Sequence, residues 1–476
     1  MMRSMFSAVS GLRAHQTRMD VIGNNISNVN TVGFKGSRVT FQEVFSQTLR
    51  GAGSPQDGRG GTNPQQVGLG INVASMDTFH IRGAVERTDY NTDLMVNGDG
   101  FFIVADDPNF LNRSYTRAGN FALDEAGNLV TADGFKILGY MADENGVLKS
   151  ALEGIKISKA VTFDAKKTEK VAFEGNLNSE AKAMTSFNMI SAATPLPGAN
   201  TVAGATYDPA TPTTSDYVYL RKVHPNGGFT YEINPAYEEA VARETSFQVY
   251  DQLGGIHQIK QAYIKVSNNN YAVETFYVNP DGSMVRAETG NTSLAGAPPT
   301  LTFNTQGKLT AATTLNLTVG AGKTNGAGPF TFEVDFNNLT MFANTSTASA
   351  TKINGFKQGT LEDFAIASTG EIMGVFDNGQ RRILGQIALA NFKNPAGLEK
   401  TASNMYRVTS NSGQAMIGVP VSGGFGNLNP GALEMSNVDL SREFTNMITT
   451  QRGFQANSRI ITTSDEMLQE VVNMKR

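Results

Sequence analysis

Residues 436–476 read SNVDLSREFTNMITTQRGFQANSRIITTSDEMLQEVVNMKR, and this stretch decides the fold at the ends of the chain. One set of its residues recurs at alternating intervals of four and three, the spacing that presents a continuous stripe along one face of a helix. The set is Leu440, Phe444, Met447, Gln451, Phe454, Ser458, Ile461, Asp465, Leu468 and Val472. The stretch therefore predicts a long C-terminal helix, whose first turn Ser436 or Asn437 could cap.

The N-terminal segment carries the same pattern. Its stripe comprises Met5, Val9, Leu12, Gln16, Met19, Ile22 or Gly23, Ile26 and Val29. The helix should end between residues 30 and 36, where NTVGFKG has poor helix propensity. The two helices could pack on a globular core, or they could form a coiled-coil-like pair that associates with copies of itself. Polar stripe positions favour the pair, because polar side chains fit poorly in the dry core of a monomer.

Composition excludes several classes of protein. The chain has 476 residues, and its 39 basic and 43 acidic residues include no extended basic run, so we expect no nucleic-acid partner. It has no cysteine, which removes disulfides and thiolate metal sites, and its four histidines are scattered. We therefore expect no metal and no cofactor.

The chain also lacks the apolar segments that membranes and the secretory pathway require. No stretch approaches the roughly 18 apolar residues that span a bilayer, and the first residues lack the apolar core of a cleaved Sec signal. The sequence thus predicts no membrane insertion. Export would have to follow a route that uses no cleaved Sec signal.

Between the two helices the apolar period changes from 3.5 to 2. From about residue 73 onward, alternating runs such as FFIVAD are separated by Asn-Gly and Asp-Gly pairs, which are typical of β-hairpins. The pattern of residues 121–139 recurs at residues 364–385 with nearly equal offsets. This recurrence could reflect the limited set of turn sequences. The simpler interpretation is one discontinuous β domain, contributed by residues 71–147 and 358–430.

Residues 148–357 form a block between those two halves. The block has low-charge stretches rich in Ala, Thr and Pro, together with alternating runs such as SFQVYD and YAVETFYV. It predicts an inserted β domain with long loops, built as one or two subdomains. Residues 31–70 read as a connecting segment, and residues 1–30 and 435–476 as the terminal helical domain. The predicted fold class is therefore mainly β with α-helical termini.

Several motifs that suggest chemistry fail on inspection. Residues 320–324, GAGKT, lack the glycine of a phosphate-binding loop, because Leu317 stands six residues before the lysine. Residues 89–100 begin like a calcium loop but lack its central glycine and its final glutamate. Ser179 and Lys182 have the spacing of a Ser-Lys acyl enzyme without its companion motifs. We predict no catalytic residues and no enzyme.

Three stretches of the chain resemble bacterial flagellar axial proteins, the family of rod and hook subunits. They are DVIGNNISNVNTVGFKGSR at residues 20–38, the β-rich run at residues 96–140, and the C-terminal stretch at residues 436–476. The three occur in the order that the family shows. The residues that match the family's terminal motifs are Asn24, Asn25, Asn28, Asn30, Gly33, Phe34, Gln451 and Asn457.

The length and the inserted block favour the hook branch of this family, because rod subunits that resemble the chain at both ends are typically shorter. The resemblance implies a structural subunit that polymerises with copies of itself into a flexible extracellular tube, the universal joint between rod and filament. The terminal helices would form the inner tube and the inserted block an outer domain. The expected assembly residues are Met5, Val9, Leu12, Met19, Ile26, Leu440, Phe444, Met447, Phe454, Ile461, Leu468 and Val472.

The resemblance also implies a set of partners. These are the flagellar rod, the hook cap, the hook-filament junction proteins and the flagellar type III export apparatus. Two other functions compete with a hook subunit. A distal rod protein would share the termini but form a stiff shaft. A secreted β-rich adhesin would use the terminal helices only as an oligomerisation stalk.

Overall fold

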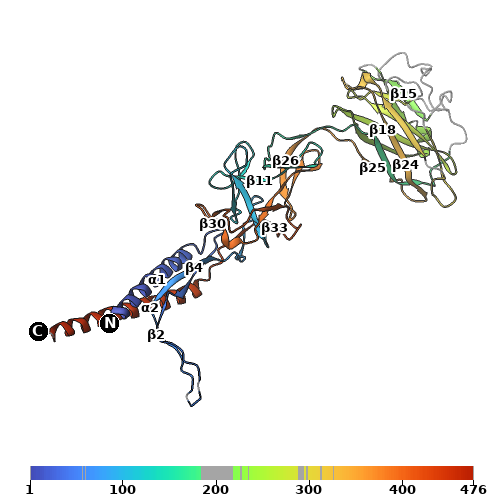
Figure 1. Cartoon of the computed structure of the whole chain (residues 1–476). Helices are drawn as coiled ribbons and strands as arrows, with labels where there is room; N and C mark the ends of the chain where they lie inside the picture. The colour runs from blue at the N-terminus through green and yellow to red at the C-terminus, as the bar shows by residue number, and fades with distance from the viewer. Residues whose placement is uncertain are drawn as a thin grey trace. The chain divides into compact units, whose positions relative to one another are not determined.

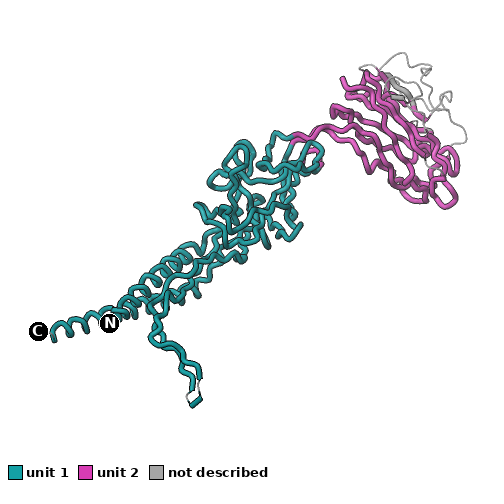
Figure 2. The backbone as a smooth tube through the Cα atoms, in the orientation of Figure 1, with its two compact units in different colours: residues 1–161, 361–375, 381–476 teal, residues 162–360, 376–380 magenta. Residues whose placement is uncertain are grey.

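The computed structural model describes residues 2–474, apart from residues 56, 59, 184–217, 226–227, 234, 288–293, 296–298, 311–312 and 325. The chain divides into two compact units (Figure 2). Unit 1 comprises residues 1–161, 361–375 and 381–476, and unit 2 comprises residues 162–360 and 376–380. The predicted fold class, mainly β with a helix at each end, is confirmed.

Two long helices form one end of unit 1 (Figure 1). They are α1 (Met2–Ser27) and α2 (Leu440–Asn473), and they pack against each other along their length. Asp439 caps α2, because its carboxylate accepts hydrogen bonds from the amides of Ser441 and Arg442 at 2.9 and 3.3 Å. The cap is therefore neither Ser436 nor Asn437. Among the described residues, no helix has an apolar window long enough to cross a membrane.

Residues 31–70, which were predicted to be a connecting segment, contribute to two strand pairs. β1 (Ser37–Glu43) pairs with β4 (Ile71–Thr78), and α1 contacts both strands. β2 (Ser46–Arg50) pairs with β3 (Gln65–Gly68) in a separate hairpin that projects from the helices in Figure 1. Within residues 31–70, β1, β2 and β3 are therefore paired strands, and the pairing satisfies their backbone groups.

The rest of unit 1 is built from short strands. They are β5 (Val85–Arg87), β6 (Leu94–Asn97), β7 (Phe101–Ala105), β8 (Arg113–Thr116), β9 (Ala122–Leu123), β10 (Leu129–Val130), β11 (Lys136–Ala142), β12 (Leu148–Gly154), most of β26 (Gly359–Ile366), β27 (Glu371–Phe376), β28 (Arg381–Ile387), β29 (Leu389–Asn391), β30 (Glu399–Lys400), β31 (Met405–Arg407), β32 (Met416–Gly418), β33 (Asn427–Pro430) and β34 (Ala432–Glu434). The main sheet has the order β27-β28-β11-β7-β8-β31-β30. Its core includes Phe101, Tyr115, Leu138, Phe392 and Tyr406.

The two segments with recurring sequence meet in this sheet. β11 contains the end of the first copy of the pattern and β28 contains the end of the second, and the two strands pair antiparallel, with Gly139 opposite Ile387. The strands of the first half extend further than expected, because β12 pairs with β11. The structure consequently begins unit 2 at Thr162, whereas the sequence placed the start of the inserted block at residue 148.

Unit 2 contains two β-sheets. Its strands are β13 (Thr162–Phe163), β14 (Lys170–Asn178), β15 (Tyr219–Val223), β16 (Phe229–Ile233), β17 (Val241–Tyr250), β18 (Ile256–Ser267), β19 (Asn270–Val278), β20 (Met284–Arg286), β21 (Leu294–Ala295), β22 (Thr300–Thr302), β23 (Thr314–Val319), β24 (Phe330–Phe342), β25 (Ser349–Ile353) and the start of β26 (Gly359–Ile366). One sheet has the order β21-β23-β24-β14-β25, and the other β15-β16-β20-β19-β18-β17.

A single apolar core joins the two sheets of unit 2. Phe173 of β14 packs against Phe247 and Tyr263 of the second sheet, with ring centroids 5.3 and 6.2 Å apart. Alternate residues along β24, such as Phe332 and Phe336, point into the same core. The described part of unit 2 is therefore one β-sandwich. A second apolar cluster, which includes Ala262, Ile264 and Phe276, buries part of the other face of the second sheet.

Candidate assembly site

The two terminal helices approach closely because each has a glycine that receives a side chain of the other. A Cβ atom added at Gly11 would lie 2.9 Å from the amide of Asn457, and one added at Gly453 would lie 2.8 Å from the ring of His15. Asn457 also donates to the Gly453 carbonyl at 2.9 Å. These contacts, with the 3.4 Å hydrogen bond from Asn25 to Glu443, fix an antiparallel register.

This register leaves the end of α2 without cover from α1. Gly11 lies opposite Asn457, and the two helices are antiparallel. The first residue of α1 therefore lies near Glu466 of α2. The last turns of α2 therefore run past α1, and Figure 1 shows the C-terminus beyond the N-terminus. Val471, Val472 and Met474 in these turns are exposed.

The most deeply buried face of α1 is not the predicted stripe. Several of its residues directly precede a residue of that stripe in the sequence. Its buried residues are Ala8, Gly11, Ala14, Ile22 and Asn25. The predicted assembly residues of this helix are only half-buried and flank that face, and they are Met5, Val9, Leu12, Met19 and Ile26. The physical reason is close approach: small residues allow the backbones to come together, and larger apolar side chains fit beside the contact.

The face of α2 that is covered contains part of the predicted stripe. Its polar residues, however, are not the ones that were predicted. Met447, Phe454, Ile461 and Leu468 are half-buried, and they alternate with Thr450, Asn457 and Ser464. The polar residues expected in the stripe, Gln451, Ser458 and Asp465, are exposed instead. The predicted assembly residues Leu440, Phe444 and Val472 are exposed as well, so the chain itself does not cover them.

Motif residues in the last turn of α1 and just after the helix join the helix pair to the strands. Asn25 donates to the Ser37 carbonyl at 2.8 Å and accepts from the Ser37 amide at 3.0 Å. Gly33 has a φ of 70°, and a Cβ there would lie 2.5 Å from the backbone nitrogen of Ala118. Only glycine fits this turn, since a side chain would meet both backbone strain and overlap. Phe34 is buried, with the Lys400 ammonium 4.0 Å from its ring centroid.

The other motif residues lie outside this junction. Asn24 and Asn30 are exposed, and Asn28 is half-buried, where it donates to the Asn24 carbonyl at 2.9 Å. Gln451 is exposed on α2, and Asn457 belongs to the contact with Gly11. The structure therefore brings together Asn25, Gly33 and Phe34 at one place and Asn457 at another.

Lys35, the residue after Phe34, forms a buried ion pair with Glu434. The ammonium of Lys35 donates to Glu434 Oε1 at 2.7 Å, and neither side chain has any exposed area. Lys35 also donates to the Ile81 carbonyl at 2.8 Å, and the Gly83 amide donates to Glu434 Oε1 at 2.9 Å. Arg117 lies on the other side of the carboxylate, with 3.6 Å between Nη1 and Glu434 Oε2. We call Lys35, His80, Arg117, Tyr406 and Glu434 the junction cluster.

The junction cluster joins segments from both ends of the sequence. The backbone adds to the side-chain contacts, because the Gly33 amide donates to the Glu434 carbonyl at 2.7 Å. Asn437 accepts from the Gly36 amide at 2.8 Å and donates to the Phe79 carbonyl at 2.8 Å. Residues that precede α2 are thus bonded to residues that follow α1, so the two helices enter the strands through one joint.

Burial governs the protonation of this cluster. Burial lowers the pKa of Lys35, while the Glu434 carboxylate opposes that change. Burial also lowers the pKa of Arg117 and raises the pKa of Tyr406 to about 12. The pKa of His80 falls to about 4, first because of burial and then because of the charges of Lys35 and Arg117. At neutral pH the imidazole of His80 is therefore neutral.

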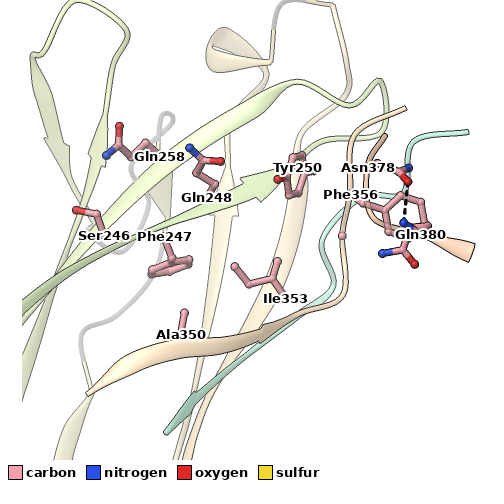
Figure 3. Close-up of a pocket in the computed structure, with 11 residues that line it drawn as sticks. Ser246, Phe247, Gln248, Tyr250, Gln258, Ala350, Ile353, Phe356, Asn378 and Gln380 are labelled. Atoms are coloured by element: carbon pink, nitrogen blue, oxygen red, sulfur yellow. Dashed lines mark hydrogen bonds between the residues drawn. The ribbon is translucent and has the colours of Figure 1, made fainter. Parts of the chain in front are cut away.

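Unit 2 offers a cavity of about 510 Å³, shown in Figure 3. Its lining includes the side chains of Gln248, Gln258, Asn378 and Gln380 beside Phe356. None of the described residues that line it is charged. Within the described ranges, no three carboxylate or imidazole side chains are placed to hold a metal ion. The cavity supplies no acid or base, and we assign no reaction to it.

One buried group in unit 2 has the residue types of a catalytic triad. His257 lies 3.0 Å from Asp251 Oδ2 and 3.0 Å from the Tyr277 hydroxyl. Asp251 also accepts from the amides of Leu253 and Gly255 in its own turn. His257 and Asp251 are buried, so this arrangement holds the turn between β17 and β18.

The sequence did not indicate Lys35, Arg117 or Glu434 as functional residues. A signal was present, because Lys35 follows Phe34 in the N-terminal motif and Glu434 stands between Leu433 and Met435. A charged residue among apolar ones can mark a buried ion pair. Its partner, however, cannot be read from sequence.

Four descriptions of protein families match the chain. "Flagella basal body rod protein" matches residues 5–35, and "Flagellar hook protein FlgE/F/G D1 domain" matches residues 95–176. "Flagellar basal body protein FlaE D2 domain" matches residues 220–356, and "Flagellar basal body rod FlgEFG protein C-terminal" matches residues 429–474. The matches include most of α1, all of α2, strands of unit 1 and much of unit 2.

Two relatives are similar over their whole length. The flagellar hook protein FlgE of Borreliella burgdorferi is 39% identical over 502 aligned residues, which cover 100% of both chains. The flagellar hook protein FlgE of Treponema pallidum is 37% identical, again over 100% of both chains. The crystal structure of Helicobacter pylori flagellar hook protein FlgE2 matches 74% of this chain and 100% of that one, with a TM-score of 0.48 and 15% identity.

The glycine contact predicts that two glycine-to-alanine substitutions in α1 differ in their effect on stability. Gly23→Ala should stabilise the helix pair by about 0.5–1 kcal/mol, because no atom lies within 4 Å of the added methyl and alanine favours helix. Gly11→Ala should give no such gain, because Asn457 must move. Thermal unfolding followed by circular dichroism at the helix band checks the pair. An equal gain at both positions would contradict the close contact.

The turn after α1 predicts a second difference between glycines. Gly33→Ala should destabilise unit 1 by more than about 3 kcal/mol, since it combines a strained φ with overlap against the backbone of Ala118. Gly134→Ala is the matched control, because Gly134 has a φ of 84° and no atom within 4 Å of the added methyl. It should cost about 1 kcal/mol from strain alone. Calorimetric unfolding of the two variants measures the difference.

The low pKa of His80 predicts a loss of stability in acid. In the unfolded chain His80 binds a proton near pH 6.5, but in the folded chain it does so only near pH 4. As pH falls from about 6.5 to 4, the unfolded state therefore gains about 3 kcal/mol relative to the folded state. His80→Gln should remove this part of the pH dependence. Unfolding free energies at pH 7 and pH 4 test this, and equal losses in both proteins would refute it.

Proposed function

Because the chain belongs to the flagellar hook protein family and is a structural subunit of the hook, we propose that it polymerises through its terminal helices into a flexible tube that transmits torque from rod to filament. One observation carries this proposal. α2 exposes large apolar side chains that α1 does not cover, and Phe444 is 49% exposed. Exposed apolar residues along one element mark a surface that another chain covers.

Most of the exposed apolar residues fall into two sets along α2, and Ile460 lies between the sets. Leu440, Phe444 and Ile448 lie near its start, and Met467, Val471 and Val472 lie near its end. The second set belongs to the turns that run past α1. We infer that neighbouring copies cover both sets, since burial of apolar surface is the main driving force for association.

The proposed assembly residues include the half-buried stripe beside the helix contact. They are Met5, Val9, Leu12, Met19, Ile26, Leu440, Phe444, Met447, Phe454, Ile461, Leu468 and Val472. The half-buried members would serve two purposes, because they support the helix pair on one side and can contact a neighbour on the other. Asn25, Gly33 and Phe34 would instead hold the junction between helices and strands.

We propose a division of mechanical roles along the chain. The helical segments 1–30 and 435–476 would line the inner tube and keep it closed. The discontinuous β domain would carry load outward from the junction cluster. The inserted domain would make the outer contacts, where small interfaces permit sliding and therefore bending.

The proposal extends to location and partners. The assembled tube would lie outside the cell, after export of the subunit through the flagellar type III apparatus without a cleaved Sec signal. Its ends would contact the rod, the hook cap and the hook-filament junction proteins. A distal rod protein is less well supported, because both full-length relatives above carry the hook name. No observation favours an adhesin.

A charge on the exposed face of α2 should prevent assembly. Phe444→Asp should abolish tube formation without unfolding the subunit, because Phe444 is half exposed in the free chain but would be buried against a neighbour. Gln455→Asp on the same helix is the control, since Gln455 is exposed and polar. Electron microscopy of the purified polymer and circular dichroism of the subunit measure the two effects. Normal tubes from Phe444→Asp would rule out this face as the interface.

A further inference from the structure

The junction cluster contains four buried polar atoms that have no hydrogen-bond partner in the described part of the protein. Within the described part of the chain, no protein group hydrogen-bonds to His80 Nδ1, Arg117 Nε, Tyr406 Oη or Glu434 Oε2. Arg117, Tyr406 and Glu434 are each at least nine-tenths buried. An unsatisfied buried polar group costs about 1–3 kcal/mol, so four in one place require an explanation.

Three of the four groups surround the ring of Phe101, and the fourth, Glu434, lies beside one of them. The rings of His80 and Tyr406 have centroids 5.6 and 5.8 Å from that of Phe101, and 5.3 Å from each other. The guanidinium carbon of Arg117 lies 4.9 Å from the same Phe101 centroid, and Nη1 lies 3.6 Å from Glu434 Oε2. The four groups therefore come from distant parts of the sequence but lie near one another, three of them at the Phe101 ring and Glu434 beside Arg117.

Their chemistry divides them into two donors and two acceptors. Arg117 Nε always carries a hydrogen, and the Tyr406 hydroxyl stays protonated because its pKa is about 12. Glu434 Oε2 is a carboxylate oxygen and can only accept. His80 is hydrogen-bonded to the backbone of Pro395, which assigns its hydrogen to Nε2, and its pKa of about 4 leaves Nδ1 as a bare acceptor.

This pattern selects the ligand. An anion would satisfy the two donors but would face the Glu434 carboxylate and the lone pair of His80. A metal cation would face the charges of Arg117 and Lys35. A water molecule accepts two hydrogen bonds and donates two, which matches the four atoms.

We propose that the junction cluster binds one internal water molecule, held by Arg117 Nε and Tyr406 Oη as donors and by Glu434 Oε2 and His80 Nδ1 as acceptors. The water completes the hydrogen bonding of the carboxylate on the side that Lys35 does not reach. It also connects the segment after β4, the residue after β8, β31 and β34. The joint between helices and strands is therefore a hydrated network, not a dry ion pair.

Crystals of the full-length chain, grown once in sodium bromide and once in potassium glutamate, test this site at a resolution that shows ordered water. We expect a density peak about 2.7–3.2 Å from the four atoms in both crystals, with no anomalous signal for bromide. An anomalous peak in the bromide crystal would assign the site to an anion. A region without a peak, in which the four groups pair directly, would also overturn the proposal.

Two conservative variants add a second readout. Tyr406→Phe removes one donor, so the peak should fall to less than half its height relative to the neighbouring ordered waters. Tyr115→Phe is the control, because Tyr115 is buried in the same core but its hydroxyl is not one of the four atoms. In the Tyr115→Phe crystal the height of the water peak should be unchanged. An unchanged peak in Tyr406→Phe would show that Tyr406 does not hold the ligand.

Discussion

The ion pair between Lys35 and Glu434 is the interaction on which the rest of unit 1 depends. Both side chains are fully buried, and a buried charge without its partner is far more costly than an exposed one. Lys35 follows α1 and Glu434 precedes α2, so the pair brings the two ends of the chain together. The closure places the end of α1 beside the start of α2, where Asn25 bonds to Glu443.

The helix pair and its junction divide the apolar surface in a way that suits a hook subunit. Ala8, Gly11 and Ala14 make the contact within the chain, and they are small. Large residues such as Phe444 and Val471 are left exposed. A chain that buried its largest apolar residues internally would have little left to attract its neighbours. Here the subunit closes on small residues and keeps larger ones for the proposed tube.

Much of the fold could be predicted from the sequence because its signals are local. The 4,3 spacing predicted α1 and α2, and the recurrence of residues 121–139 predicted hairpins whose strands β11 and β28 prove to pair. The side of each helix that faces the other could not be predicted, because apolar spacing does not reveal that glycines permit close approach. The contact of Lys35 with Glu434 spans 399 positions, so no local pattern contains it.

The central claim is that the buried charges of the junction cluster hold the helices to the strands. Hydrogen exchange at the Gly33 and Gly36 amides, which donate to Glu434 and Asn437, measures the opening of this joint. Glu434→Gln should lower the opening free energy by about 3–5 kcal/mol, because it leaves two cations without a carboxylate. Lys35→Met should cost less, since Arg117 still balances Glu434, and it should partly rescue Glu434→Gln in the double variant. Unchanged protection, or equal and additive losses, would contradict the claim.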